Sequence, residues 1–120
     1  MKSSPTEAAA ALLPLQPRDY LILLALADEP LHGHGLLKAV EAQAGGVLFD
    51  PANLYRLLRK LERDELVEEV EPAGRREESR RRQYALTTLG RSVLMAESNR
   101  LARLAEAARA RKLVTHKPSR

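Results

Sequence analysis

The sequence predicts a mainly α-helical fold with one small β-hairpin. Within residues 50–64, four leucines recur at the spacing of a single helical face: Leu54, Leu57, Leu58 and Leu61. Two short runs at 66–71 and 82–86 have the β-branched content or the alternation of strands, and Pro72 and Gly74 follow the first run. Residues 87–112 contain no proline and repeat apolar residues at helical spacing, which predicts a long final helix.

Length and composition restrict the class of protein. A chain of 120 residues forms one domain with a modest core. The absence of cysteine excludes a disulfide framework, a thiolate metal site and a cysteine nucleophile. The longest apolar run, 20–27, is too short to span a bilayer, and the N-terminus lacks the apolar region of a leader peptide. We therefore expect a soluble, cytoplasmic protein that carries no cofactor.

Basic residues are concentrated in the second part of the chain. The net charge is +4, but residues 1–50 hold three Lys or Arg against six acidic residues, and residues 51–120 hold 17 against 10. A localised positive field attracts polyanions. With only three Tyr and one Phe, the chain lacks the aromatic surface on which single-strand binders stack bases.

The first firm element is predicted to begin at Pro17, after a flexible arm over residues 1–16 in which the alanine run favours a helix between Glu7 and Leu13. Proline suits the first position of a helix, and Asp19 favours its first turn. The residues that follow, 20–27, are apolar on every side, so this helix needs burial against more than the core of its own domain. A second subunit would supply that burial, and Tyr20 and Leu24 are therefore predicted at a dimer interface.

The next helix is predicted for residues 31–44, and Gly45 and Gly46 are predicted to end it. Its inward face consists of Leu36, Leu37, Val40 and Ala44. His32 and His34 near its start invite interpretation as a metal site. Zinc usually takes three or four ligands, and neither a cysteine nor a third nearby histidine is present. A solvated or hydrogen-bonded pair of histidines is therefore the preferred interpretation, and no metal is expected.

The helix predicted for residues 50–64 has two chemically different faces. Asp50 and Pro51 form its start, as N-cap and first helical residue. The face opposite the leucines carries no acid and consists of Ala52, Asn53, Tyr55, Arg56, Arg59, Lys60 and Arg63. Such a helix fits a DNA major groove, where Arg and Lys donate to phosphates and guanine and Asn bonds adenine. An ordinary solvated face is the alternative. The short Gly-containing turn before it makes a helix-turn-helix.

The predicted hairpin has a basic tip with five arginines within eight residues: Arg75, Arg76, Arg80, Arg81 and Arg82. A tip of this kind directly after a reading helix is a wing, which can lay arginine on phosphates or into a narrow minor groove. A solvated loop is the alternative, although crowded like charges favour a polyanion partner or neutralising acids nearby. Residues 17–86 are thus predicted to form a winged helix-turn-helix domain that binds DNA.

The last helix is predicted to be capped by Thr87. Its apolar seam, interrupted at Glu97 and Ser98, consists of Leu94, Leu101, Leu104 and Ala108. At about 1.5 Å per residue, the helix is longer than so small a domain can cover. We therefore expect residues 87–113 to dock on a partner chain, with the seam in the dimer interface, and residues 114–120 to form a disordered tail.

These motifs together resemble the PadR-like transcriptional regulators. The resemblance is carried by DYLILLALADEPLHGHGLLKAV, by NLYRLLRKLERDELV and by GRREESRRRQYALTTLGRSVL. It implies a homodimer built from the terminal helices and operator binding that is usually repressive. By resemblance, the DNA-facing residues are Asn53, Tyr55, Arg56, Arg59 and Lys60, with a wing of Arg75, Arg76, Arg80 and Arg81. Two departures concern base readout, since Ala52-Asn53 stands where Gly-Thr or Gly-Ser is frequent and His34 where Tyr is common.

The sequence therefore predicts a homodimeric regulator that binds a pseudo-palindromic stretch of double-stranded DNA sequence-specifically. Two alternatives stay open: a winged-helix module that binds an acidic protein, and a nonspecific nucleic-acid binder. Enzymatic activity is not expected, because the two histidines and the scattered acids form no nucleophile–base or paired-carboxylate arrangement. Some relatives bind small aromatic effectors, but this sequence contains no Trp and identifies no effector.

Overall fold

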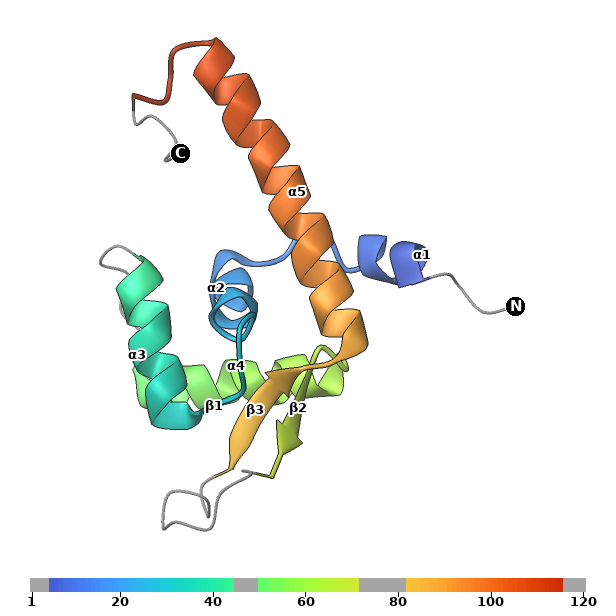
Figure 1. Ribbon diagram of the computed structural model, residues 1–120, viewed down its shortest axis with the longest axis vertical. Helices are drawn as coiled ribbons and strands as arrows, with labels where there is room; N and C mark the ends of the chain where they lie inside the picture. Colours follow the sequence, from blue (N-terminus) through green and yellow to red (C-terminus); the bar gives the residue numbers. More distant parts are fainter. Residues whose placement is uncertain (1–4, 45–49, 72–81, 116–120) are drawn as a thin grey trace.

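The computed structural model of the protein describes residues 5–44, 50–71 and 82–115, and the chain within these limits is mainly helical (Figure 1). In chain order the elements are α1 (Pro5–Ala10), α2 (Pro17–Ala25), β1 (Leu31–His32), α3 (Gly33–Ala44), α4 (Pro51–Arg63), β2 (Val67–Val70), β3 (Gln83–Leu86) and α5 (Thr88–Ala110). The predicted fold class, a helical domain with a small β element and a long final helix, is confirmed.

The strands form an antiparallel sheet in the order β1–β3–β2. Val67 of β2 lies opposite Leu86, and Val70 lies opposite Gln83, so the two predicted hairpin strands pair along their whole length. The sequence did not predict β1, since residues 31–32 were assigned to the start of the next helix. A strand of two residues is too short to show alternation, and Leu31 is extended because it pairs with Tyr84 of β3.

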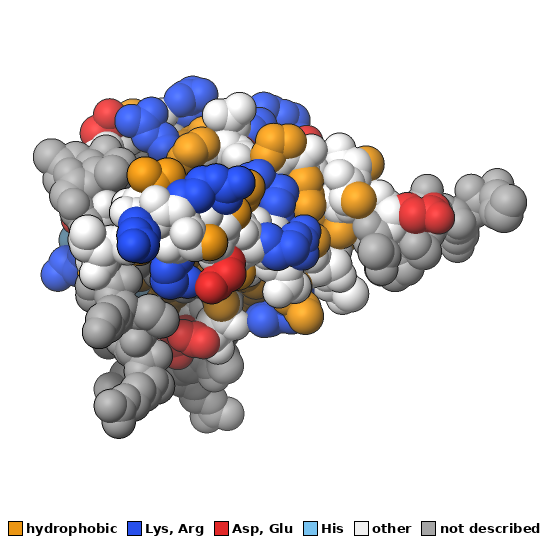
Figure 2. All heavy atoms as spheres, turned by 90° about the horizontal axis from the view of Figure 1, so that it is seen from above, with side chains coloured by type: hydrophobic (Ala, Val, Ile, Leu, Met, Phe, Trp, Pro, Cys, Tyr) orange, Lys and Arg blue, Asp and Glu red, His pale blue; other side chains and the backbone are white. Residues whose placement is uncertain are grey.

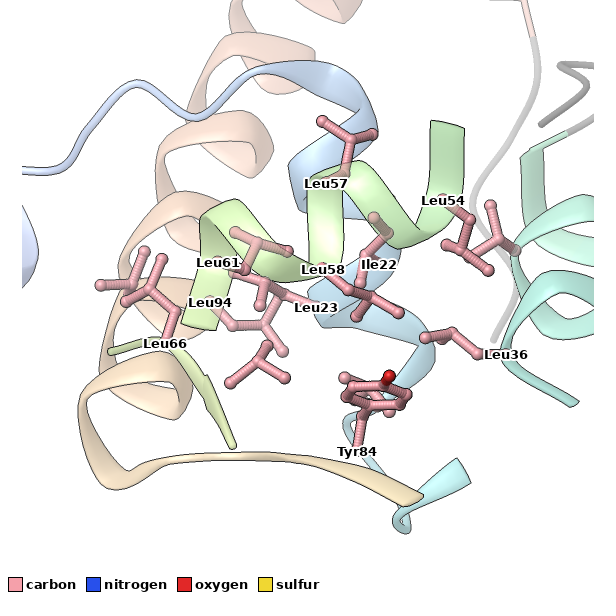
Figure 3. Close-up of a cluster of buried hydrophobic side chains, with 14 of the residues drawn as sticks. Ile22, Leu23, Leu36, Leu54, Leu57, Leu58, Leu61, Leu66, Tyr84 and Leu94 are labelled. Carbon is pink, nitrogen blue, oxygen red and sulfur yellow. The ribbon is translucent and has the colours of Figure 1, made fainter. Parts of the chain in front are cut away.

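The leucine stripe of α4 forms the centre of the core, as the spacing predicts: Leu54, Leu57, Leu58 and Leu61 are all buried. In Figure 3 these side chains meet Ile22 and Leu23 of α2 and Leu94 of α5. Full burial of a leucine contributes about 1.5–3 kcal/mol. The back of α4 is therefore fixed firmly, and the opposite face is held in a defined orientation.

Both ends of α4 are built as the chain chemistry requires. Asp50 Oδ1 accepts from Asn53 N at 2.8 Å, the N-cap predicted from the sequence. At the other end, Glu65 adopts a left-handed conformation with φ 63°, and Leu66 N donates to Leu61 O at 2.9 Å. This turn directs the chain sharply from α4 into β2.

The start of α5 packs against that same turn. Thr87 Oγ1 accepts from Gly90 N at 2.9 Å, which confirms Thr87 as the predicted cap. A Cβ at Gly90 would lie 2.0 Å from Leu66 O, so only glycine allows α5 to approach this closely. The domain and its final helix are therefore joined without a linker.

Residues 5–16, the described part of the predicted N-terminal arm, contain a helix that begins two residues before the predicted one. The alanine run forms α1, which packs on α5 and buries Ala9. After it, Leu15 N donates to the carboxylate of Glu97 on α5 at 3.0 Å. Alanine favours helix strongly, but the anchoring comes from α5, which lies far away in the sequence. Beyond these contacts the outer end of α5 projects from the body of the molecule (Figure 1).

Candidate nucleic-acid interface

The outer face of α4 carries most of the side chains that the sequence assigned to DNA contact. Its exposed residues include Tyr55, Arg56, Arg59 and Arg63. Because the leucines on the opposite face are buried, this set must point away from the core. Within the set, Arg56 donates through Nη2 to Oδ1 of Asn53, one helical turn earlier. The pair presents a guanidinium and an amide side by side, two groups suited to base edges or phosphates.

Lys60 lies differently from the other predicted DNA contacts. Its ammonium is 2.6 Å from Oδ2 of Asp19 on α2, so it points toward the neighbouring helix. No local pattern in the sequence indicated this pair, because the two residues are 41 positions apart. Spacing within α4 places Lys60 on the basic face, but its partner depends on how α2 crosses α4.

Tyr55 is held at the edge of this face by a glycine. A Cβ at Gly33, the first residue of α3, would lie 2.0 Å from the Tyr55 hydroxyl oxygen. The ring is 38% exposed, so one side rests on the α3 backbone and the rest faces outward. The close approach of Tyr55 thus explains why a glycine stands at position 33, at the start of α3.

A polar cavity of about 410 Å³ lies beside Tyr55, and the sequence did not predict it. It is lined by His32, Gly33, His34, Tyr55, Arg82 and Tyr84. His32 Nδ1 accepts from Gly35 N at 3.2 Å, and the rings of His32 and His34 stack with their centroids 6.5 Å apart. The pairing of β1 with β3 brings His32 beside the strand of Tyr84, and α3 and α4 contribute the remaining walls. Among the described residues, no three His, Asp or Glu side chains cluster as metal ligands would.

Acidic groups bound the basic surface near β2. Arg82 Nη1 lies 3.4 Å from Glu69 Oε2 as an ion pair. Burial and the charge of Glu69 raise the pKa of the Glu62 carboxyl, with Arg59 opposing the shift. Burial, followed by Glu69 and Glu62, also raises the pKa of the Tyr84 phenol. Negative charge at this edge limits the region where a polyanion can lie.

The predicted wing contacts Arg75, Arg76, Arg80 and Arg81 lie outside the described residues. The structure describes strands β2 and β3, which flank that segment. Both strands lie on one side of α4 (Figure 1). Arg82, the last arginine of the predicted tip, is exposed at the start of β3.

The residues predicted for the dimer interface divide into two groups. Leu94 lies in the core of its own domain, and Tyr20 is half-buried with its hydroxyl 2.8 Å from Ser98 Oγ. Leu24, Leu101 and Ala108 are half-buried, and Leu104 is 54% exposed. Figure 2, seen from above the outer end of α5, shows hydrophobic side chains lying between Lys and Arg side chains.

Glu97 and Ser98, which interrupt the apolar seam of α5, hold the N-terminal segments in place. Glu97 is 1% exposed and accepts from Arg100 Nε at 2.5 Å as well as from Leu15 N. The hydrogen bond from Arg100 lowers the pKa of Glu97, and the Leu15 amide acts in the same direction, whereas burial opposes both. The polar interruption is therefore a junction between α5 and the segment that precedes α2.

Comparison with known proteins identifies the family. A sequence model of the transcriptional regulator PadR-like family matches residues 22–96, more than half of the chain. The chain belongs to this family. In this PadR-like chain, the matched residues run from within α2 through α4 to the inner part of α5.

One curated relative of the PadR-like chain is an uncharacterised 37.1 kDa protein of transposon TN4556 from Streptomyces fradiae. It is 42% identical over 84 residues, which cover 70% of this chain and 23% of that protein. The PadR-like chain therefore spans less than a quarter of the length of that relative.

Solved structures share the fold. A PadR family transcription regulator from Clostridium difficile R20291 gives a TM-score of 0.69 at 19% identity, covering 79% of this chain and 97% of that chain. A PadR-like transcription factor from Bacteroides fragilis gives 0.58 at 27% identity, covering 77% and 86%. A mutant of MepR from S. aureus gives 0.67 at 20% identity, covering 88% and 73%. The predicted winged-helix architecture is thereby confirmed. In the described part of the PadR-like chain, no helix is both long and apolar enough to cross a membrane.

Proposed function

We propose that the protein is a transcriptional regulator that binds double-stranded DNA sequence-specifically through the outer face of α4. The observation that carries the proposal is the division of this helix, with four buried leucines behind and exposed Tyr55, Arg56, Arg59 and Arg63 in front. An α-helix fits the width of the major groove, and its outward side chains can then reach base edges. Membership of a family of transcriptional regulators supports the same function.

Each group of residues has a role in this proposal. Arg56 and Asn53, already joined by a hydrogen bond, face the bases together, and Arg59 and Arg63 meet bases or phosphates further along the groove. Arg75, Arg76, Arg80 and Arg81 form the wing and neutralise phosphates or enter the minor groove. Lys60 was predicted as a contact on the same face, but its ammonium is bound by Asp19.

The active species in the proposal is a homodimer. The outer part of α5 presents Leu101, Leu104 and Ala108, and Tyr20 and Leu24 of α2 add apolar surface. Two-fold symmetry places two α4 helices on successive major grooves, so half-sites lie about 10 bp apart or a multiple of that. Occupation of such an operator represses transcription by excluding other proteins from the same DNA.

Selection from a random duplex library at about 150 mM salt, where purely electrostatic binding is weakened, tests this proposal. An enriched inverted repeat is expected. Arg59→Ala should weaken binding to that repeat by about 1–3 kcal/mol. Arg103→Ala removes the same charge from the exposed face of α5 and serves as the matched control, with affinity unchanged.

Other outcomes of the selection point to different functions. Strong, salt-sensitive binding without enrichment would show a nonspecific nucleic-acid binder. No duplex binding at all would contradict the proposal and favour an acidic protein as the partner of the basic face.

A further inference from the structure

A partly buried ion pair joins α4 to α2. Lys60 Nζ lies 2.6 Å from Asp19 Oδ2, and Asp19 is only 2% exposed. The lysine side chain is 42% exposed, and its ammonium is paired with the enclosed carboxylate. The two partners therefore differ: the acid is enclosed by the protein, and the base is able to reach either the acid or the solvent.

Asp19 depends on this lysine. Its second oxygen, Oδ1, is buried and has no hydrogen-bond partner among the described residues. A carboxylate taken out of water is costly unless it is paired. Because Lys60 supplies the hydrogen bond and the positive charge to Asp19, moving the ammonium away would leave an uncompensated buried charge.

There is room for Lys60 to move. Two cavities, of about 410 Å³ and about 180 Å³, are each lined by both Asp19 and Lys60. The larger one is also lined by Arg56, which lies on the proposed DNA-reading face. The ammonium is thus near the groove-facing surface without being directed to it.

On the basis of the proposed function, we propose that Asp19 is a positioning residue that withholds Lys60 from DNA. The carboxylate takes the place that a backbone phosphate would otherwise occupy on this lysine. A phosphate is a weaker competitor, since solvent and salt screen its charge whereas Asp19 is sheltered from both.

Specificity is the consequence of this arrangement. Each phosphate that a cation neutralises adds affinity for any DNA sequence. Holding one cation inside the protein lowers the sequence-independent part of the affinity and leaves the contacts of Arg56 and Arg59 unchanged. The pair also fixes α4 on α2. The residue after Asp19 in α2 is Tyr20, whose hydroxyl is hydrogen-bonded to Ser98 Oγ of α5 at 2.8 Å. The reading helix is in this way tied to the helix proposed to form the dimer.

The dependence of duplex affinity on salt measures how many cations reach the DNA. Each phosphate contact contributes about 0.9 to the slope of log K against log salt concentration. Slopes are compared for the wild type, Lys60→Met, Asp19→Asn and the double variant that combines these two substitutions. Arg59→Met is the matched control, because it removes a cation that points outward. The duplex is a fixed sequence unrelated to the selected operator, so that base readout does not enter.

The expected results are opposite for the two partners. Lys60→Met leaves the slope unchanged, whereas Arg59→Met reduces its magnitude by about 0.9. Asp19→Asn releases Lys60, increases the magnitude by about 0.9 and tightens binding about fivefold at about 0.15 M salt. That increase disappears in the double variant, which a general structural effect of Asp19→Asn would not produce.

The inference is overturned if Lys60→Met reduces the slope as much as Arg59→Met while Asp19→Asn changes nothing. In that case the wild type still binds duplex, so the proposed function survives. A wild type that binds no duplex overturns both. Where Lys60→Met fails to fold because Asp19 is left unpaired, the comparison of Asp19→Asn with the double variant decides, and Lys60→Arg should retain the wild-type slope.

Discussion

The two halves of α5 carry similar apolar patterns and have different surroundings. In the inner half, Gly90, Val93 and Leu94 are buried against α2 and the turn after α4. In the outer half, Leu104 is exposed and projects with the helix away from the domain. A repeating apolar seam therefore shows that a helix needs a partner without showing whether the partner belongs to the same chain.

Polar residues differ between the halves in the same way. Glu97 is buried and bound by Arg100 and by the backbone of Leu15, so it serves as an anchor. In the outer half, Arg109 pairs with Glu106, whose side chain is 74% exposed. Exposed pairs contribute about 0–1 kcal/mol. The inner half is thus specified by the domain, and the outer half is left to be specified by a partner.

Adding one carbon to the inner half should have the largest effect. Gly90→Ala places a methyl group 2.0 Å from the Leu66 carbonyl oxygen, and the rigid backbone there cannot move aside cheaply. We expect a loss of about 3 kcal/mol in the free energy of unfolding, measured by chemical denaturation. Gly35→Ala is the control, because its new methyl group meets His32 at an ordinary 3.5 Å and should not destabilise. Equal stability of the two variants would contradict this packing.

A charge in the outer half should separate folding from assembly. Leu104→Asp removes apolar surface that each protomer is proposed to bury in the dimer, at a cost of about 2 kcal/mol or more. Sedimentation equilibrium should show dissociation, while the denaturation of the monomer is unchanged. Met95→Asp, at an exposed position of the inner half, is the control and should leave the dimer intact. Dissociation by both variants, or by neither, would remove Leu104 from the interface.

The anchor at Glu97 should give the fold an acid-sensitive contribution. Because Arg100 and the Leu15 amide hold the pKa of Glu97 below its usual value, the folded state takes up a proton less readily than the unfolded state. The stabilisation is complete above about pH 4.3 and is lost as the pH falls through the lower, folded-state pKa. Glu97→Gln should lack this acid-dependent loss and be about 1 kcal/mol less stable at about pH 7.

Denaturation curves recorded from neutral pH to a pH below the folded-state pKa of Glu97 check this predicted acid dependence. Glu106→Gln, at an exposed position in the outer half of α5, is the control. That control should follow the wild type at every pH. An identical pH dependence for Glu97→Gln and the wild type would show that Glu97 is not the anchor.

The smallest effect is a gain at the turn on which the inner half rests. Glu65 has φ 63°, a region that costs residues with a Cβ about 1 kcal/mol and that glycine enters freely. Glu65→Gly should therefore raise the free energy of unfolding by about 0.5–1 kcal/mol. Glu68→Gly, in the extended strand β2, is the control and should destabilise, since glycine weakens a strand interior. A loss at both positions would mean that the turn is not strained.

The sequence by itself determined the structure of α4 almost completely. Its cap at Asp50, its leucine back and its basic front follow from residues within one another's reach along a single helix. The same holds for the cap of α5 at Thr87 and for the two hairpin strands, whose boundaries differ from the prediction by at most one residue. Family membership was likewise predictable from these local motifs.

Tertiary structure decided which partners the side chains meet. Lys60 pairs with Asp19 across 41 residues, and Leu15 with Glu97 across 82. Strand β1 exists because β3 lies beside it, and the place of α1 is set by its packing on α5. Periodicity within a helix or strand states only that a face must be buried or that a charge is present. The neighbour is fixed when all elements close around one core, and the sequence of a single element does not contain that information.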